Sequence, residues 1–231
     1  MLGEASIIIP TYNELGNLPV MIDRLSVVSS KIAEDVEIVI VDDNSPDGTG
    51  QEANRLAVEH SNVRVIHRPR KMGVGSAIYE GVMAASASNI VMMDADMHHR
   101  PEFVPSITNS LQKFDIVIAS RFMDSSGMQA SSLIRRMATR FGNRLASVLL
   151  HLNVKDYTHG FRGYRKSTFL SCYRKEDRGG EFNLRILIEA RKRNYSIVEV
   201  PYRSEHPGKS QIRNWIRYLH LIVKESLTIR N

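Results

Sequence analysis

The first half of the chain alternates short apolar runs with segments whose apolar residues recur at helical spacing. Most of the runs are apolar on both faces, which is typical of strands covered on each side of a sheet. The runs predict strands at Ser6–Ile9, Glu37–Val41, Val63–His67, Ile90–Met93 and Ile116–Ala119. The segments between them predict helices at Leu18–Ser29, Gly50–His60, Ser76–Ala87 and Glu102–Gln112. These repeated strand-helix-strand units predict an α/β fold with a mainly parallel sheet and helices on both of its faces.

The regular alternation ends after Arg121. The remainder predicts a long helix from about Leu133 to Leu152, then a polar segment, and then three further elements. These are a helix at Phe182–Arg193, a strand at Ile197–Val200 and a final helix at Ile212–Ile229. Because the length suits one large domain, we expect a single domain over residues 1–231, with one half over about 1–121 and another over about 122–231.

Acidic residues follow several of the predicted strands. The fourth strand ends in Asp94-Ala95-Asp96, the second in Asp42-Asp43, and Glu14 follows the first. Open α/β sheets bind ligands at the carboxyl ends of their strands, so these acids would lie along one binding edge. Mg²⁺ and Mn²⁺ favour carboxylate oxygens and use one or two of them beside a substrate's phosphates. Asp94 and Asp96 therefore predict a divalent metal site, the alternative being a solvated turn, and Asp43 could accept hydrogen bonds from a nucleobase or a ribose.

Two glycine patterns narrow the choice of ligand. The first strand is not followed by Gly-x-Gly-x-x-Gly, which excludes a Rossmann dinucleotide site. Gly73-Val74-Gly75 lacks the third glycine; after Lys71 it predicts either a close-approach loop near a phosphate or a plain turn. Gly208-Lys209-Ser210 is not a P-loop, because Arg203 stands where the first glycine would be needed.

Composition and charge restrict the partners. The net charge of +6 and the pI near 9.5 indicate an anionic partner, which could be nucleic acid, phospholipid or a phosphorylated small molecule. A nucleic-acid module is disfavoured because the basic segments lack interleaved exposed aromatics. The single Cys172 is consistent with a reducing compartment. With no signal peptide and no apolar run of about 18 residues, we expect a protein that is soluble or bound to a membrane surface.

The long helix after Leu133 carries both apolar and basic residues. Its apolar residues follow helical spacing, which by default predicts a face buried in the core; they are Ile134, Met137, Ala138, Phe141, Leu145, Val148 and Leu149. Arg136, Arg140 and Arg144 form a basic stripe with Arg135 beside it. The stripe predicts contact with a phosphate or with anionic headgroups, the alternative being a solvated face.

Five ordered motifs resemble the polyprenyl-phosphate glycosyltransferases, and most of all the catalytic domain of the dolichol-phosphate mannosyltransferases. They are Pro10-Thr11-Tyr12-Asn13-Glu14, Val41-Asp42-Asp43-Asn44-Ser45-Pro46-Asp47-Gly48-Thr49, Met93-Asp94-Ala95-Asp96, Ser120-Arg121-Phe122 and Asp156-Tyr157-Thr158-His159-Gly160-Phe161-Arg162. The resemblance implies a GT-A fold, a nucleotide-sugar donor such as GDP-mannose, and Mg²⁺ or Mn²⁺. It also implies an inverting transfer to a polyprenyl or dolichyl phosphate, by a protein bound peripherally to the cytoplasmic face of a membrane.

The resemblance also implies roles for individual residues. The nucleotide sugar would be held by Pro10, Tyr12, Glu14, Asp42, Asp43, Lys71, Asp94, Ala95 and Lys209. Asp94 and Asp96 would bind the metal, and Asp96 and Arg121 would act at the reacting phosphates. We expect Arg135, Arg136 and Arg140 to bind the acceptor phosphate.

The chain departs from the family pattern at three places. His98 replaces the usual Gln, and we expect it to be the third metal contact, which would favour Mn²⁺. Glu205 and Gln211 replace basic residues near Gly208, and His159 replaces a Ser. These departures leave open UDP-glucose or another nucleotide sugar as donor, and a different lipid phosphate or a sugar hydroxyl as acceptor.

The type of acceptor decides whether a general base is needed. A phosphate monoester has a second pKa of about 6, so its attacking oxygen is already ionised near neutrality. A hydroxyl acceptor would instead need a base, for which the candidates are Asp156, His159 and Glu181.

Overall fold

The computed structural model describes residues 5–29, 36–123, 133–204, 218 and 221–222, without the side chains of residues 134, 135 and 138. Its strands are β1 (Ala5–Thr11), β2 (Val36–Asp42), β3 (Val63–His67), β4 (Asn89–Met92), β5 (Ile116–Ser120), β6 (Arg162–Arg165) and β7 (Ile197–Pro201). Its helices are α1 (Leu18–Ser29), α2 (Thr49–Glu59), α3 (Val74–Ala84), α4 (Val104–Leu111), α5 (Leu133–Leu150), α6 (Lys166–Cys172) and α7 (Phe182–Lys192). A 3₁₀ turn, Pro101–Phe103, precedes α4.

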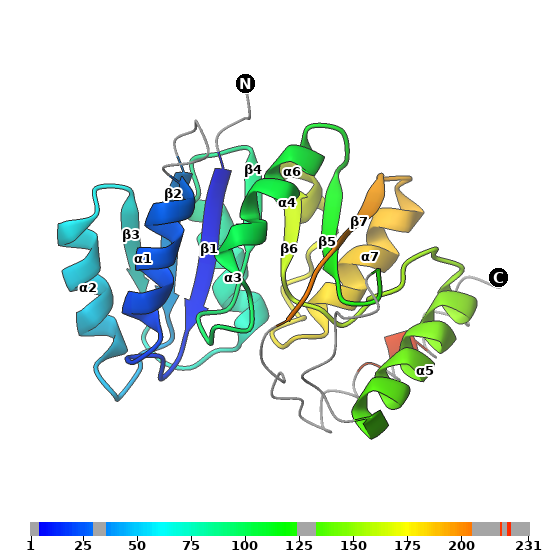
Figure 1. Cartoon of the computed structure of the whole chain (residues 1–231), viewed down its shortest axis with the longest axis horizontal. Coiled ribbons are helices and arrows are strands. Elements are labelled where there is room, and N and C mark those ends of the chain that lie inside the picture. Colours follow the sequence, from blue (N-terminus) through cyan, green and yellow to red (C-terminus); the bar gives the residue numbers. More distant parts are fainter. Residues whose placement is uncertain (1–4, 30–35, 124–132, 205–217, 219–220, 223–231) are drawn as a thin grey trace.

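The strands form one sheet in the order β3-β2-β1-β4-β6-β5-β7 (Figure 1). Strand β6 is antiparallel to both of its neighbours, β4 and β5, and the other pairings are parallel. The carboxyl ends of β1, β2, β4 and β5 therefore meet at the same edge of the sheet. The predicted α/β fold with a mainly parallel sheet is confirmed.

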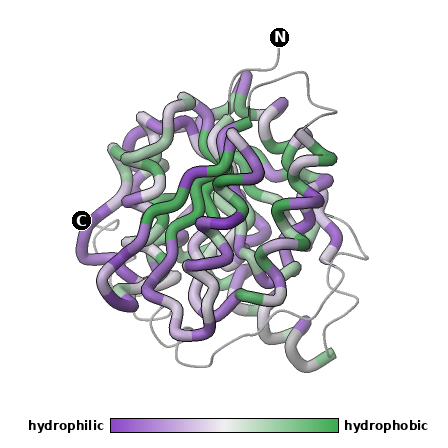
Figure 2. Tube along the Cα trace, turned by 90° about the vertical axis from the view of Figure 1, so that its left-hand side faces the viewer, coloured by the Kyte–Doolittle hydropathy of each residue, from purple (hydrophilic) through white to green (hydrophobic). Residues whose placement is uncertain are grey.

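The sheet is covered on both faces because successive side chains of a strand point to opposite sides. In β1, Ile7 and Ile9 pack with the apolar residues of α1, α2 and α4. Ile8 lies between them and packs on the other face, with residues of α3, α5, α6 and α7. Figure 2 shows the result as hydrophobic strands running through the middle of the molecule. The core thus fixes the strands while their ends stay available for a site.

The structure differs from the sequence-based prediction mainly after residue 150. The predicted polar segment contains β6 and α6, which the apolar pattern did not indicate. Strand β6 reads Arg-Gly-Tyr-Arg and has no β-branched residue to mark it. Of the predicted final helix, only Tyr218, Leu221 and Ile222 lie among the described residues; they are helical and buried.

Candidate active site

The predicted metal carboxylates lie just beyond the end of β4. Ala95 is buried and anchors the turn, while Asp94 and Asp96 on either side of it are partly exposed. Surrounding protein atoms raise the pKa of Asp94 to about 6, with the neighbouring His98 acting in the opposite direction. Nearly half of the Asp94 side chain is still open to solvent, so the carboxylate lies recessed in an open site rather than inside the core.

The carboxylates at this site fit a divalent cation. Burial raises the pKa of Asp94, and among the described residues no hydrogen-bond donor counteracts this shift. Asp96 Oδ1 accepts the backbone N–H of His98 at 3.2 Å, and its Oδ2 lies 3.6 Å from His98 Nε2. Within the described residues, no group of three or more His, Cys, Asp or Glu side chains is arranged to hold a metal ion. Two carboxylates are enough for Mg²⁺ or Mn²⁺ bound together with substrate phosphates, and a metal contact by His98 stays a prediction.

The loop that carries these carboxylates is held by two residues that the sequence reasoning missed. His99 Nδ1 accepts the backbone N–H of Asp94 at 2.8 Å, and burial lowers the pKa of His99 to about 3, so its ring is neutral. Tyr202, which follows β7, donates its hydroxyl hydrogen to the carbonyl of His98 and accepts the N–H of Arg100 at 3.2 Å. The loop is therefore held by one of its own residues, His99, and by Tyr202 from the segment that follows the edge strand β7. The only sequence signal was a histidine beside a metal motif.

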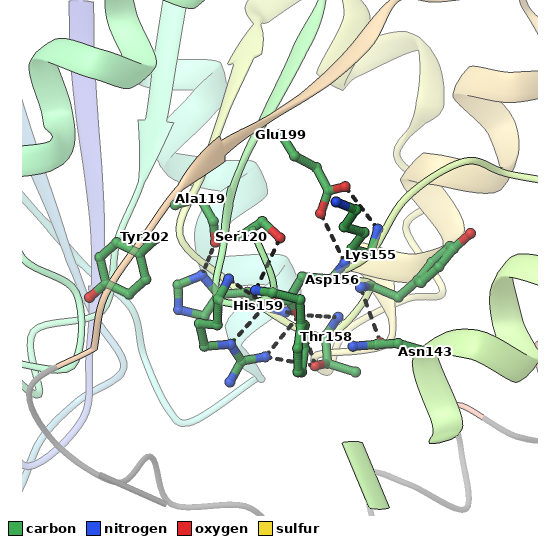
Figure 3. Close-up of polar contacts among 12 residues, drawn as sticks. Ala119, Ser120, Asn143, Lys155, Asp156, Thr158, His159, Glu199 and Tyr202 are labelled. Atoms are coloured by element: carbon green, nitrogen blue, oxygen red, sulfur yellow. Dashed lines mark hydrogen bonds and ion pairs between the residues drawn. The ribbon is translucent and has the colours of Figure 1, made fainter. Parts of the chain in front are cut away.

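Arg121 lies at the end of β5 and is bound to Asp156. Figure 3 shows Asp156 and the polar contacts around it. Its Nε and Nη2 donate to the two carboxylate oxygens of Asp156 at 2.8 Å each, and Nη2 also donates to Thr158 Oγ1 at 2.9 Å. Burial opposes the charge of Asp156, but the adjacent guanidinium outweighs it and holds the pKa of Asp156 well below its usual range. None of these contacts uses Arg121 Nη1.

The loop of residues 156–161 joins this arginine to the metal carboxylates. The rings of His159 and Phe161 lie 5.0 and 5.1 Å from that of His99. A side chain at Gly160 would lie 3.9 Å from Asp94 Oδ2. Strands β4 and β5 are separated only by β6, so their ends are roughly 10 Å apart. The structure thus brings the predicted metal and arginine positions into one site.

Backbone contacts with buried polar side chains support the 156–161 loop. Glu199 on β7 accepts the N–H groups of Lys155 and Asp156 at 2.8 and 3.0 Å (Figure 3). Arg162 is fully buried and donates to three backbone carbonyls, those of Tyr157, His159 and Asn183. Arg162 is therefore a structural residue, and its burial explains how an arginine-rich segment forms a central strand.

The predicted nucleoside acids at the end of β2 have protein partners. Asp43 is ion-paired with the buried Arg68 and accepts the N–H groups of Met72 and Gly73 at 3.1 and 3.3 Å. Asp42 accepts hydrogen bonds from Thr11 Oγ1 and from the hydroxyl and N–H of Ser45. A carboxylate has about four acceptor positions. Asp42 and Asp43 each accept three hydrogen bonds, so each can accept about one more from a ligand. Both acids shape the loops at this edge, and their contact with a nucleoside stays a prediction.

Lys71 and Tyr12 lie together at the same edge, with the Lys71 ammonium 3.5 Å from the centre of the Tyr12 ring. Pro10 and Glu14, two residues before and after Tyr12, are both partly exposed. Glu14 Oε2 accepts a hydrogen bond from Asn17. An exposed cation over an aromatic ring is a suitable surface for a base and a phosphate. Lys209 lies outside the described residues, and the side chain of Arg135 is likewise not described.

Gly73 and Gly75, predicted to form either a close-approach loop near a phosphate or a plain turn, lie against the backbone of residues 177–179. The N–H of Gly75 donates to the carbonyl of Arg178 at 2.8 Å. A Cβ atom at Gly73 would lie 2.4 Å from the same carbonyl oxygen, and one at Gly75 would lie 2.3 Å from the carbonyl oxygen of Asp177. The glycines are thus needed for packing two backbone segments together.

The default prediction that the apolar face of α5 is buried is wrong for three residues. Met137, Phe141 and Val148 are 64%, 72% and 60% exposed, and Leu133 is 63% exposed. The inward face instead carries the partly or fully buried residues Arg136, Thr139, Asn143, Ala146 and Leu150. Helix α5 packs at one side of the molecule (Figure 1), and it presents apolar side chains to solvent and polar ones to the site.

Comparison with known proteins identifies a family and several relatives. Residues 6–171 match the family model described as glycosyl transferase family 2. The undecaprenyl-phosphate mannosyltransferase of Micrococcus luteus is 34% identical, over 84% of this chain and 80% of that protein. The polyprenol monophosphomannose synthase of Mycolicibacterium smegmatis is 32% identical (84% and 75%), and the dolichol-phosphate mannosyltransferase of Saccharomyces cerevisiae is 30% identical (94% and 84%).

A solved structure agrees with the fold. Glucosyl-3-phosphoglycerate synthase from Mycobacterium tuberculosis, in complex with Mn²⁺, uridine diphosphate and phosphoglyceric acid, superposes with a TM-score of 0.72 at 20% identity. The match covers 99% of this chain and 78% of that one. None of the described helices is both long and apolar enough to cross a membrane.

Proposed function

This chain belongs to glycosyl transferase family 2, and we propose that it transfers mannose from GDP-mannose to a polyprenyl or dolichyl phosphate, with inversion at the anomeric carbon. The observation that carries the proposal is the set of relatives at 30–34% identity, each named for a mannose and a polyprenyl or dolichol phosphate. We place the reaction at the cytoplasmic face of a membrane, with the protein attached peripherally.

The site suits departure of a nucleoside diphosphate. In the transfer, the bond from the anomeric carbon to the diphosphate breaks and a bond to the acceptor's phosphate oxygen forms. Asp94 and Asp96 would hold a divalent cation, which when bound offsets the charge that develops on the leaving diphosphate. Arg121, fixed in direction by Asp156, offers its remaining N–H groups to the same phosphates or to those of the acceptor.

The acidity of the neighbouring groups favours a phosphate acceptor over a hydroxyl. Asp156 is held ionised by Arg121, and its pKa lies far below that of a useful base. Burial, followed by the charge of Arg121, lowers the pKa of His159 well below its usual value, and its Nδ1 is already 2.6 Å from the carbonyl oxygen of Ala119. Two of the three candidate bases are therefore weak. An ionised phosphate oxygen needs no base.

Helix α5 supplies the argument for a membrane surface. Its apolar residues Leu133, Met137, Phe141 and Val148 are exposed, and the exposed Arg140 and Arg144 flank them. An apolar stripe beside arginines suits the boundary between acyl chains and anionic headgroups. On the same helix, Arg136 is partly buried. A lipid phosphate could then reach the reaction while its prenyl chain stays with the apolar stripe.

A filter assay tests the reaction. Purified protein is incubated with radiolabelled GDP-mannose or UDP-glucose, with Mn²⁺ or Mg²⁺, and with either a short polyprenyl phosphate or the corresponding polyprenol. We expect label in the lipid phase only with GDP-mannose and the phosphate. Label from UDP-glucose instead would correct the donor, and transfer to the polyprenol would overturn the phosphate acceptor.

A liposome assay tests the surface. Phe141→Ser should weaken binding to anionic liposomes by about 10- to 100-fold, the effect of keeping one phenyl ring from burial. The matched control is Val58→Ser on α2, because Val58 is 88% exposed and lies on a helix at the opposite side of the molecule (Figure 1). Arg140→Ala should raise the acceptor KM and leave donor binding unchanged. Equal binding by Phe141→Ser and Val58→Ser would exclude α5 as the membrane surface.

A further inference from the structure

The inward face of α5 carries two buried hydrogen-bond donors that have no acceptor among the described residues. Asn143 is 4% exposed, and its Oδ1 accepts the N–H of Tyr157 at 3.2 Å. Because only the amide oxygen can accept that hydrogen, the contact fixes the direction of the amide. Asn143 Nδ2 and the buried Nε of Arg136, two turns earlier on the same face, have no hydrogen-bond partner in the part of the chain that is described. An unpaired buried donor costs about 1–3 kcal/mol, a cost that a hydrogen bond to a ligand oxygen would remove.

Asn143 lies beside the loop that holds Arg121, because it binds Tyr157, the residue next to Asp156. Figure 3 shows the Asn143 side chain directed toward Thr158. Thr158 Oγ1 accepts the Nη2 hydrogen of Arg121 at 2.9 Å. The Asp156 carboxylate beside it is occupied by donors from Arg121, Thr158 and His159. The donors at this point that these contacts do not use are Arg121 Nη1 and Asn143 Nδ2. A set of convergent donors without a free carboxylate suits a phosphate.

We propose that Asn143 binds the acceptor, by donating an Nδ2 hydrogen to an oxygen of its phosphate monoester and so orienting that phosphate beside Arg121. The inference rests on the proposed function, because it assigns a specificity residue to the acceptor of that reaction. Asn143 contributes a neutral donor that binds the phosphate without adding charge. A polyprenol has a single hydroxyl oxygen, whereas a phosphate offers a separate oxygen to each of these two donors.

Asn143→Asp separates this role from a structural one. The aspartate keeps an oxygen for the N–H of Tyr157, but it replaces the Nδ2 donor by a negatively charged oxygen. The acceptor KM for a short polyprenyl phosphate should rise about 10- to 100-fold, as expected for loss of a hydrogen bond to a charged group. The KM for the nucleotide sugar should stay at the wild-type value. The Tm is measured alongside it and should fall, because the new charge is buried. Asn109→Asp, at an exposed position of α4, makes the same charge change away from the site and is the matched control.

The outcomes are distinct. An acceptor KM equal to that of wild type in Asn143→Asp would show that Asn143 only supports Tyr157, and would overturn the inference. If Asn143→Asp does not fold, Asn143→Ser is measured instead, and a rise confined to the acceptor KM supports the inference whereas equal rises in both KM values overturn it. Absence of transfer to polyprenyl phosphate by the wild-type protein would refute the proposed function itself, and the inference with it.

Discussion

Replacing Asp156 by asparagine removes the charge of a carboxylate that lies wholly inside the protein. The carboxylate accepts three hydrogen bonds from Arg121, from its backbone N–H at 3.2 Å and from Nε and Nη2 at 2.8 Å each. Both oxygens face arginine N–H groups, so an amide NH₂ in either orientation meets a donor. The variant also leaves Arg121, whose side chain is only 14% exposed, without its counter-charge.

Removing one partner of a buried ion pair costs about 3–5 kcal/mol. We expect the lower end, because the small exposed part of Arg121 lets water satisfy some of the lost contacts. For a domain of this size, a loss of about 3 kcal/mol lowers the Tm by roughly 6–12 °C. The assays are urea unfolding of Asp156→Asn, Arg121→Met and the double variant. The double variant should lose less stability than the sum of the two single variants, since the uncompensated charge is gone.

The pH dependence gives an independent check. The pKa of Asp156 is lowered in the folded protein, so its contribution is fully present above the unfolded value of about 4 and is lost only as the pH falls toward the folded pKa. The stability difference between wild type and Asp156→Asn should therefore be constant in neutral solution and shrink in acid. A difference below about 1 kcal/mol, the range of an exposed pair, would refute the buried-pair reasoning.

Further expectations concern the metal loop and the sheet. Asp96→Asn should abolish transfer with an unchanged Tm, and excess EDTA should abolish it in wild type; activity that persists in EDTA would exclude a metal role. His98→Gln should lower the ratio of the Mn²⁺ rate to the Mg²⁺ rate, because imidazole is a softer ligand than an amide, and an unchanged ratio would make His98 a loop residue. Gly163→Ala should cost about 1–3 kcal/mol of stability, because its Cβ would lie 2.4 Å from Ile107 Cγ2; Gly16→Ala, with nothing within 4 Å, is the control in the same urea titration.

The apolar pattern was enough to predict the first half of the fold. Strands such as β1 and β2 are apolar on both faces, and each helix between them has one apolar side, so only a doubly covered sheet can bury them all. Because parallel strands place their carboxyl ends on one edge, the clustering of Asp94, Asp43 and Glu14 near that edge followed from sequence as well. The motifs around Asp94 and Arg121 then indicated the family.

The antiparallel strand β6 and the partners of the polar side chains could not be predicted in this way. β6 is a strand because β4 and β5 pair with it on either side. Its Arg162 is tolerated because two carbonyls of the preceding loop and one of α7 accept its hydrogen bonds. The sequence predicted that Asp43 accepts hydrogen bonds from a nucleoside. In the structure its carboxylate already binds Arg68 and two backbone N–H groups. Hydrogen-bond partners far apart in the chain leave no periodic signal.

Helix α5 shows the same division most plainly. The sequence determined that Leu133–Leu150 is a helix with apolar and basic residues at helical spacing, because this follows from contacts between residues three and four apart. It could not determine which side faces inward, since the default rule buries the apolar side. Tertiary structure places Asn143 against Tyr157 and leaves Phe141 exposed. The N–H of Tyr157 lies in a loop far along the chain from Asn143, so the spacing of residues within α5 could not show that this face meets a polar partner.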